Sequence, residues 1–170
     1  MRHHLKSFFV RHEPIAGQPF SHLKSGLGGL VGIAASGLLA TSTGQPFLIA
    51  PFGASAVLLF GQPASPLAQP ANALGGYAVA TVVTLAILLL MPAGWPAAAT
   101  GVGIAIALMA MLRVTHPPAG AIPILAATSD IHGLTLVLVV AGGSALLVAL
   151  AALHHWLPPR TVYPKRPDAG

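Results

Sequence analysis

The stretch Pro-Ala-Gly-Ala at 118–121 repeats the pattern Pro-x-Gly-Ala of residues 51–54, Pro-Phe-Gly-Ala. Each copy lies at the beginning of a short apolar segment, 51–60 or 117–128. Neither segment is long enough to cross a bilayer as a helix, because a crossing takes about 20 residues. Short segments interrupted by Pro and Gly, at matching places in two halves of a membrane protein, point to a binding site.

The composition indicates an integral membrane protein. The chain has 170 residues, of which 55% are hydrophobic and 6% are charged, whereas a soluble domain has about 25% charged residues. Residues 25–155 contain two charged side chains, Arg113 and Asp130. The stretches 1–24 and 156–170 are basic, and basic residues that flank membrane spans stay in the cytoplasm. We expect a multi-pass protein of a bacterial-type inner (plasma) membrane, with two cytoplasmic tails and an even number of crossings.

Four apolar stretches define a transmembrane domain over residues 25–155. The expected spans are 25–44, 73–91, 95–112 and 134–153. The two Pro-x-Gly-Ala copies are 67 residues apart (118 minus 51), and this offset also brings the first two spans close to the last two. The order predicts two repeats, 25–91 and 95–155. We predict an all-α membrane protein with four transmembrane helices and two short re-entrant half-helices in tandem repeats. The alternative is six crossings, with both short segments crossing and the repeats inverted.

The start of each short segment has the features of an anion site. Proline favours the first helical turn, so the backbone N–H groups of residues 52–54 and 119–121 are expected to be free donors. Glycine lets an ion approach the backbone, and a helix N-terminus attracts anions. Two such ends meeting at mid-membrane would suit a weakly hydrated monovalent anion. The alternative is that Pro and Gly only kink helices and let them pack.

Polar side chains near the two segments could complete this site. His116 could protonate, donate to an anion or relay a proton, or it could be a neutral histidine bonded to the backbone. Arg113 could supply positive charge at a pore mouth, or extend to the membrane interface. The expected anion-binding and translocation residues are Pro51, Gly53, Ala54, Ser55, Gln69, Asn72, Arg113, His116, Pro117, Pro118, Ala119, Gly120 and Ala121.

Enzymatic chemistry is not expected from this sequence. The chain has no cysteine and three carboxylates, and it contains neither a P-loop nor a His-Glu-x-x-His motif. The His pairs at 3–4 and 154–155 lack the carboxylate or cysteine partners of a metal site. We therefore expect no catalytic residue, metal or cofactor. The basic charge balance follows from the membrane tails and does not indicate nucleic-acid binding.

Three stretches resemble the HPP family of integral membrane proteins. Thr-His-Pro-Pro-Ala-Gly-Ala at 115–121 looks like the signature that names the family, while 51–60 resembles its "GAS…LLF" block and 67–72 its "LAQPRN" block. The resemblance covers about residues 22–155 and implies a four-span membrane domain. Plant-plastid and cyanobacterial members are associated with nitrite transport, so it also implies a small-anion transporter. Ala71 and Tyr77 depart from the family, which commonly has Arg and His there.

The expected function is therefore a transporter or channel for a small monovalent anion, with nitrite as the first candidate. Four spans enclose a cavity poorly, so we expect a homo-oligomer in the lipid bilayer. One alternative is a non-transporting membrane module that senses or scaffolds a partner. Another is a membrane enzyme, which the shortage of acids and nucleophiles disfavours.

Overall fold

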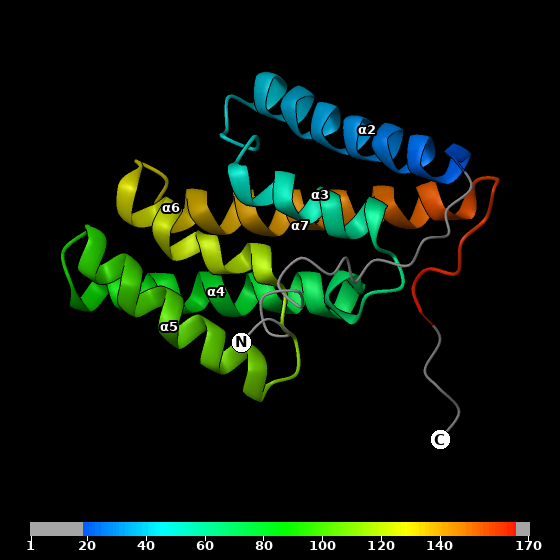
Figure 1. The fold of residues 1–170 in the computed structure, drawn as a ribbon. Coiled ribbons are helices and arrows are strands. Elements are labelled where there is room, and N and C mark those ends of the chain that lie inside the picture. The colour runs from blue at the N-terminus through cyan, green and yellow to red at the C-terminus, as the bar shows by residue number, and fades with distance from the viewer. Residues whose placement is uncertain (1–18, 166–170) are drawn as a thin grey trace, which may run out of the picture.

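The computed structural model describes residues 19–165, and this part of the chain is helical with no strand. Residues 1–18 and 166–170, which belong to the expected tails 1–24 and 156–170, lie outside the described residues. Figure 1 shows the helices α2 to α7 packed side by side. In chain order they are α2 (Pro19–Thr43), α3 (Ala50–Gly61), η1 (Pro66–Ala68), α4 (Pro70–Leu90), α5 (Trp95–Met111), η2 (Pro117–Ala121), α6 (Ile122–Thr128) and α7 (Gly133–Trp156).

Three helices are long and apolar enough to cross a membrane. They are Phe20–Thr43, Pro70–Leu90 and Gly133–Trp156, and they match three of the four expected spans. The remaining expected span, 95–112, is the shorter apolar helix α5, which has 17 residues. Helix α2 begins at Pro19, so residues 19–24, which the sequence suggested to be tail, are its first turns. The structure therefore has the all-helical membrane character that the sequence predicts.

Each short segment is an extended stretch followed by a short helix. Ile49 and His116 have extended backbone immediately before helices α3 and η2 (φ −109 and −135°). Each of the two helices has a proline in its first turn. His116 directly precedes Pro117, and the residue before a proline is disfavoured in the helical region, whereas the residue before Pro51 is Ala50, the first residue of α3. Helix α3 has 12 residues, whereas the second segment is broken further into η2, of 5 residues, and α6, of 7 residues.

The two halves of the chain run in opposite directions (Figure 1). In the first half, α2 and α4 point the same way and α3 points back between them. In the second half, α5 and α7 point the way that α3 does, and α6 points back. The packing follows the same relation, since α2 packs on α3 and α7, while α5 packs on α6 and α4. The four-crossing arrangement with re-entrant segments and parallel repeats is not confirmed by this geometry.

Glycine contacts repeat between the halves with the offset of 67 residues found in the sequence. A Cβ on Gly75 would lie 2.9 Å from Val114, and one on Gly142 would lie 3.2 Å from the ring of Phe47. Gly142 is 67 residues after Gly75, and Phe47 is 67 residues before Val114, so the second contact is the first with the halves exchanged. This exchange is what a twofold relation between two inverted repeats produces.

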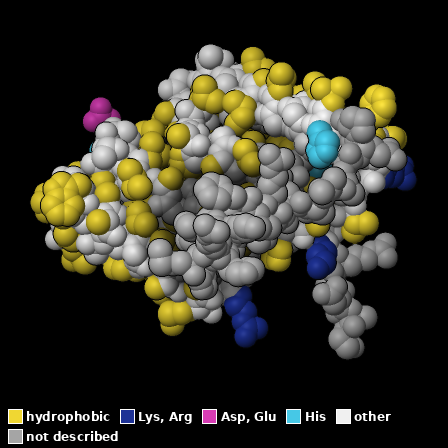
Figure 2. Space-filling view, in the orientation of Figure 1, with side chains coloured by type: hydrophobic (Ala, Val, Ile, Leu, Met, Phe, Trp, Pro, Cys, Tyr) yellow, Lys and Arg dark blue, Asp and Glu magenta, His cyan; other side chains and the backbone are white. Residues whose placement is uncertain are grey.

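Apolar side chains gather around much of the outline of the face seen in Figure 2, with a few charged side chains at its margins. Exposed residues include Leu38, Val82 and Leu89, at 67–86% exposure. Trp95, at the start of α5, and Trp156, at the end of α7, are also exposed, and they lie at opposite ends of the helix bundle. Tryptophan is enriched at the two interfaces of a membrane, so these positions fit a protein that spans one.

Candidate functional site

The beginnings of the two short segments lie close together inside the molecule. Phe52, in the first turn of α3, contacts Gly143 near the middle of α7, where a Cβ would overlap its ring. His116, immediately before η2, contacts Gly76 of α4, whose Cβ would lie 2.7 Å from that of His116. Both contacts fall within long helices, so the beginnings of the two segments are held inside the bundle.

A chain of hydrogen bonds joins the two segments. The Oγ of Ser55 in α3 lies 2.8 Å from Nε2 of His116 and 2.7 Å from the hydroxyl of Tyr77 in α4. The Tyr77 hydroxyl in turn donates to the carbonyl oxygen of Pro51, at 3.1 Å. Ser55 and His116 are fully buried and Tyr77 is 1% exposed, so water does not compete for these bonds. We call Pro51, Ser55, Tyr77 and His116 the polar chain.

The other ring nitrogen of His116 fixes its tautomer. Nδ1 lies 2.8 Å from the carbonyl oxygen of Leu67 in η1, and a carbonyl oxygen can only accept, so Nδ1 carries a proton. Asn72 holds the backbone segment that precedes His116, because its Nδ2 donates to the carbonyl oxygen of Thr115 at 3.1 Å. Hydrogen bonds to η1 and α4 therefore hold the imidazole, and the backbone beside it, in position to contact Ser55.

The expectation of free backbone donors is partly wrong. The N–H of Phe52 donates to the carbonyl oxygen of Ile49 at 3.0 Å, and the N–H of Ala119 donates to that of His116 at 3.0 Å. Each of these bonds closes a tight turn at the start of its helix, so the donors are used locally. The buried polar side chains, rather than these two N–H groups, are the polar atoms that the segments present to each other.

The glycines of the two motifs border open space. A Cβ on Gly53 or Gly120 would meet no atom within 4 Å, in contrast to the packed Gly76 and Gly143. The interpretation that the motif glycines only allow close packing therefore does not fit Gly53 and Gly120. Of the remaining motif residues, Pro51, Pro118 and Ala119 are buried, Ala121 is partly buried, and Ala54 and Pro117 are exposed.

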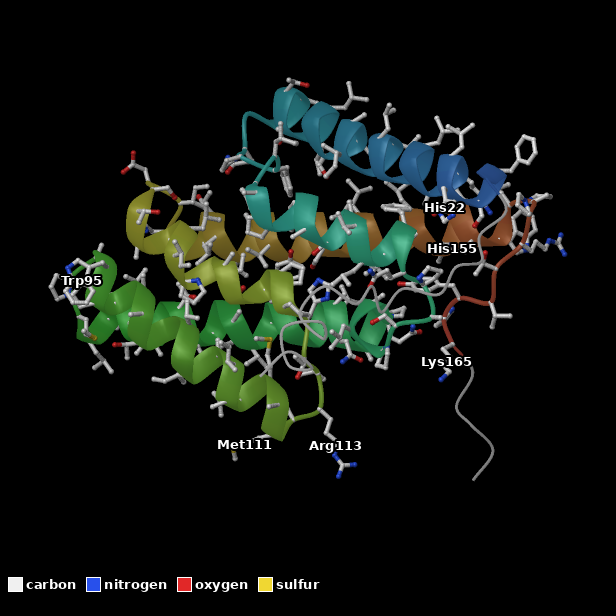
Figure 3. The ribbon with its side chains drawn as sticks, viewed as in Figure 1. His22, Trp95, Met111, Arg113, His155 and Lys165 are labelled. Carbon is white, nitrogen blue, oxygen red and sulfur yellow. The ribbon has the colours of Figure 1, made fainter. Side chains whose placement is uncertain are left out.

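Two expected site residues lie away from the polar chain. Gln69 donates to the carbonyl oxygens of Pro63 and Ser65, at 2.8 and 2.9 Å, and its Oε1 accepts from the N–H of Lys165 at 2.7 Å. It therefore stabilises the η1 loop and ties the C-terminal segment to it. Arg113 is exposed and points away from the helices (Figure 3).

Arg113 has an unusual backbone conformation, with φ of +59°. Its N–H donates to the carbonyl oxygen of Ala110 at 3.2 Å, and the N–H of Val114 donates to the carbonyl oxygen of Met109 at 2.9 Å. These two bonds form the Schellman pattern that ends a helix. Glycine usually occupies this position, because a side chain there is strained. Asn72, which bonds to Thr115, lies near Gln69 and Lys165, so Arg113 is at the same end of the bundle as the C-terminal segment.

The sequence missed Tyr77 and the carbonyl of Leu67 as parts of the site. Tyr77 lies on α4, outside both short segments, and its ring centroid is 5.2 Å from that of His116 and 5.7 Å from that of Phe52. The departure from the family pattern at this position was the signal that could have identified it. A backbone carbonyl leaves no such signal. Within residues 19–165, no three His, Asp or Glu side chains come together as a metal ion would require.

The broken helices, the inverted halves and the buried polar chain define a class of protein, an integral membrane protein with discontinuous helices around a central polar site. The sequence matches the family described as HPP, transmembrane region, over residues 14–164. The chain belongs to this family.

Two transmembrane proteins of Dictyostelium discoideum are similar to the chain. One is 35% identical over 114 residues, covering 63% of this chain and 37% of the relative, and the other is 35% identical over 113 residues, covering 62% and 40%. The chain thus spans less than half the length of these curated relatives. No solved structure matches it significantly.

Proposed function

We propose that the chain transports a small monovalent anion across a bacterial-type inner membrane, with nitrite, which the family resemblance suggests, as the first anion to test. The observation that carries this proposal is the buried Ser55–His116 hydrogen bond of 2.8 Å, which joins two broken segments of opposite direction inside the bundle. Discontinuous helices that meet near the midplane of inverted repeats are the usual setting of substrate sites in transporters.

The proposed topology is the six-crossing alternative, in which α3 and the η2–α6 segment each complete a crossing together with the extended residues before them. Lys24 near the start of α2 donates to the carbonyl oxygens of Leu157 and Pro159, at 2.7 and 2.6 Å, so both ends of the described chain lie at one end of the bundle. An even number of crossings follows. Arg113 lies at this end too, which we assign to the cytoplasm because positive charge stays inside.

The anion would bind where Gly53 and Gly120 leave the backbone approachable, beside Ser55 and His116. The hydroxyl of Ser55 and the imidazole of His116 would donate to it once the bond between them opens. Both side chains are fully buried, so the structure corresponds to a closed state of this site. Opening requires that α3 and η2 separate, and their attachment to opposite halves of the repeat provides the movable parts. We also propose a homo-oligomer, since α2 buries only 17% of its most apolar window.

Nitrite flux into proteoliposomes tests the proposal. Gly53→Leu and Gly120→Leu should each reduce flux at least tenfold, because the new side chain occupies the approach to the backbone. Neither position has an atom within 4 Å of a Cβ, so both variants should fold. Gly29→Leu and Gly103→Leu are matched controls, since their Cβ positions are equally open but lie on α2 and α5.

Wild-type flux equal to that of protein-free liposomes would refute transport of nitrite. Normal flux in both Gly53→Leu and Gly120→Leu would leave transport standing and refute the location of the site. A purified partner in fixed stoichiometry, combined with absence of flux for every anion, would favour the sensor or scaffold alternative.

A further inference from the structure

The number of protons in the polar chain does not match its number of hydrogen bonds when His116 is neutral. Four contacts need a proton: Nδ1 to Leu67, Nε2 to Ser55, Ser55 to Tyr77, and Tyr77 to Pro51. A neutral imidazole, one serine and one tyrosine supply three. A protonated imidazole supplies the fourth.

The direction of each bond follows from the two ends, which are carbonyl oxygens. The Tyr77 hydroxyl donates its single proton to Pro51, so it must accept from Ser55. Ser55 then has no proton left for His116, so Nε2 must donate to Ser55. All four contacts are therefore made together only by an imidazolium with protons on both nitrogens.

We propose that His116 is a proton-binding site that couples proton movement to anion movement. This inference rests on the proposed function for the anion, but the proton site itself does not. One proton from water adds to Nε2, and an anion that enters beside the imidazolium neutralises its charge. When the site opens to the other side, the proton and the anion leave together, so one proton moves with each anion and no net charge crosses the membrane.

The described groups packed around His116 are uncharged, so a positive charge on its ring comes from a bound proton. Among the described residues packed around it, α4 presents Tyr77 as a titratable group, α3 presents Ser55, and η1 presents the backbone carbonyl of Leu67. The segment 117–128 and helix α5 contain no titratable side chain. Arg113, three residues before His116, is exposed. Within residues 19–165 no carboxylate is bonded to the imidazole, so an anion entering the site would be its counter-charge.

The proton site is tested on the purified full chain in nanodiscs by nitrogen-15 NMR. Thr115–His116 is the one Thr-His pair in the sequence, so carbon-13 carbonyl threonine with nitrogen-15 histidine identifies His116 among eight histidines. In wild type both ring nitrogens should carry protons at the acid end of the titration. In Tyr77→Phe two contacts disappear and a neutral imidazole satisfies the rest, so the midpoint of the titration should fall by about one pH unit, a tenfold loss of proton affinity.

Ser55→Ala should lower the midpoint in the same direction, which protects the test if Tyr77→Phe fails to fold. Tyr163→Phe is the control, because its hydroxyl donates to the carbonyl of Ala68 at 3.0 Å, outside the polar chain. It should leave the midpoint unchanged. Equal midpoints in wild type, Tyr77→Phe and Ser55→Ala, or a single ring proton in wild type down to pH 5, would overturn the proton site.

Coupling is tested in proteoliposomes with the membrane potential clamped at zero and the inside one pH unit more alkaline. One-to-one coupling predicts that nitrite accumulates toward a tenfold ratio faster than in protein-free liposomes, in which neutral nitrous acid approaches the same ratio, since each 1.4 kcal/mol is a factor of ten. His116→Gln, which cannot bind the proton, should accumulate nitrite no faster than protein-free liposomes. Downhill flux without accumulation in wild type would overturn the coupling and leave anion transport intact. Absence of any flux would refute the proposed function, while the NMR titration would still decide the proton site.

Discussion

Replacing Gly76 by alanine should displace His116 and destabilise the protein. A Cβ at position 76 would lie 2.7 Å from Cβ of His116 and 3.0 Å from the carbonyl oxygen of Val114. Carbon atoms in contact are about 3.5–4.0 Å apart, so the backbone at 114–116 must move by about 1 Å. A shift of that size away from α4 would lengthen the Ser55–His116 bond, now 2.8 Å, beyond hydrogen-bond distance.

The expected loss of stability combines three terms. Overpacking a filled site costs about 1–3 kcal/mol. A buried polar group left without its partner costs about 1–3 kcal/mol more. Alanine in place of glycine in a helix returns about 1 kcal/mol. The balance is a destabilisation of about 3 kcal/mol, which corresponds to a fall in Tm of about 6–12 °C for a chain of this size.

Thermal unfolding in detergent measures this difference. Gly103→Ala on α5 is the matched control, because its Cβ would meet no atom within 4 Å and only the helix-propensity gain remains. Its Tm should equal or slightly exceed that of the wild type. A Tm for Gly76→Ala equal to that of Gly103→Ala would refute the reasoning, since it would mean that the segment 114–116 yields without cost.

Two further predictions concern Arg113, which follows the end of α5, and Tyr163, which lies in the segment after α7. Arg113→Gly should raise Tm by about 2–8 °C, because it relieves a left-handed conformation that costs about 1–2 kcal/mol for a non-glycine residue; an equal rise in Arg113→Ala would contradict this explanation. Burial raises the pKa of Tyr163 to about 12 from its usual 10. Its hydroxyl therefore stabilises the fold below pH 10, and this contribution is lost as pH rises to 12. The Tm difference between wild type and Tyr163→Phe should shrink over that range, and a constant difference would contradict the assignment.

The sequence was sufficient to predict the long helices and the all-helical character of the chain. Hydrophobic length identified α2, α4 and α7, since each is apolar over at least 20 residues. The offset of 67 residues was visible in the Pro-x-Gly-Ala motifs, and it recurs in the Gly75–Val114 and Gly142–Phe47 contacts. The direction of the short segments was not predictable from length. The extended backbone that precedes each short helix, at Ile49 and His116, spans more distance per residue than a helix does.

The site was predicted only as far as its side chains lie in the motifs. Ser55 and His116 were expected in one site, and the structure places them 2.8 Å apart. Tyr77 was not, because it lies on a long helix outside the motifs and its hydroxyl reaches Ser55 of α3 only in the folded protein. Gln69 was expected in the site, but its side-chain amide donates to the backbone carbonyls of Pro63 and Ser65 in its own loop. Local hydrogen bonds of this kind leave no pattern in a sequence.

The repeat makes the polar chain informative, because each of its members has a counterpart in the other half. At the offset of 67 residues, His116 corresponds to Ile49, Ser55 to Ile122 and Tyr77 to Ser144. The two isoleucines are buried, and the Ser144 hydroxyl donates within its own helix to Ala141. A twofold fold could have carried two such chains, yet His116 and Ser55 are polar and their counterparts are apolar. A purely structural hydrogen bond would serve either half equally well, whereas a single charge-binding group is useful once, on the path that both halves enclose. The asymmetry therefore favours a role in transport over a role in packing, and exchanging the residues tests it: in Ile49→His with His116→Ile the moved imidazole corresponds in position to His116 but has Ile122 in place of Ser55, so nitrogen-15 NMR should show that it loses the titration which the polar chain sustains.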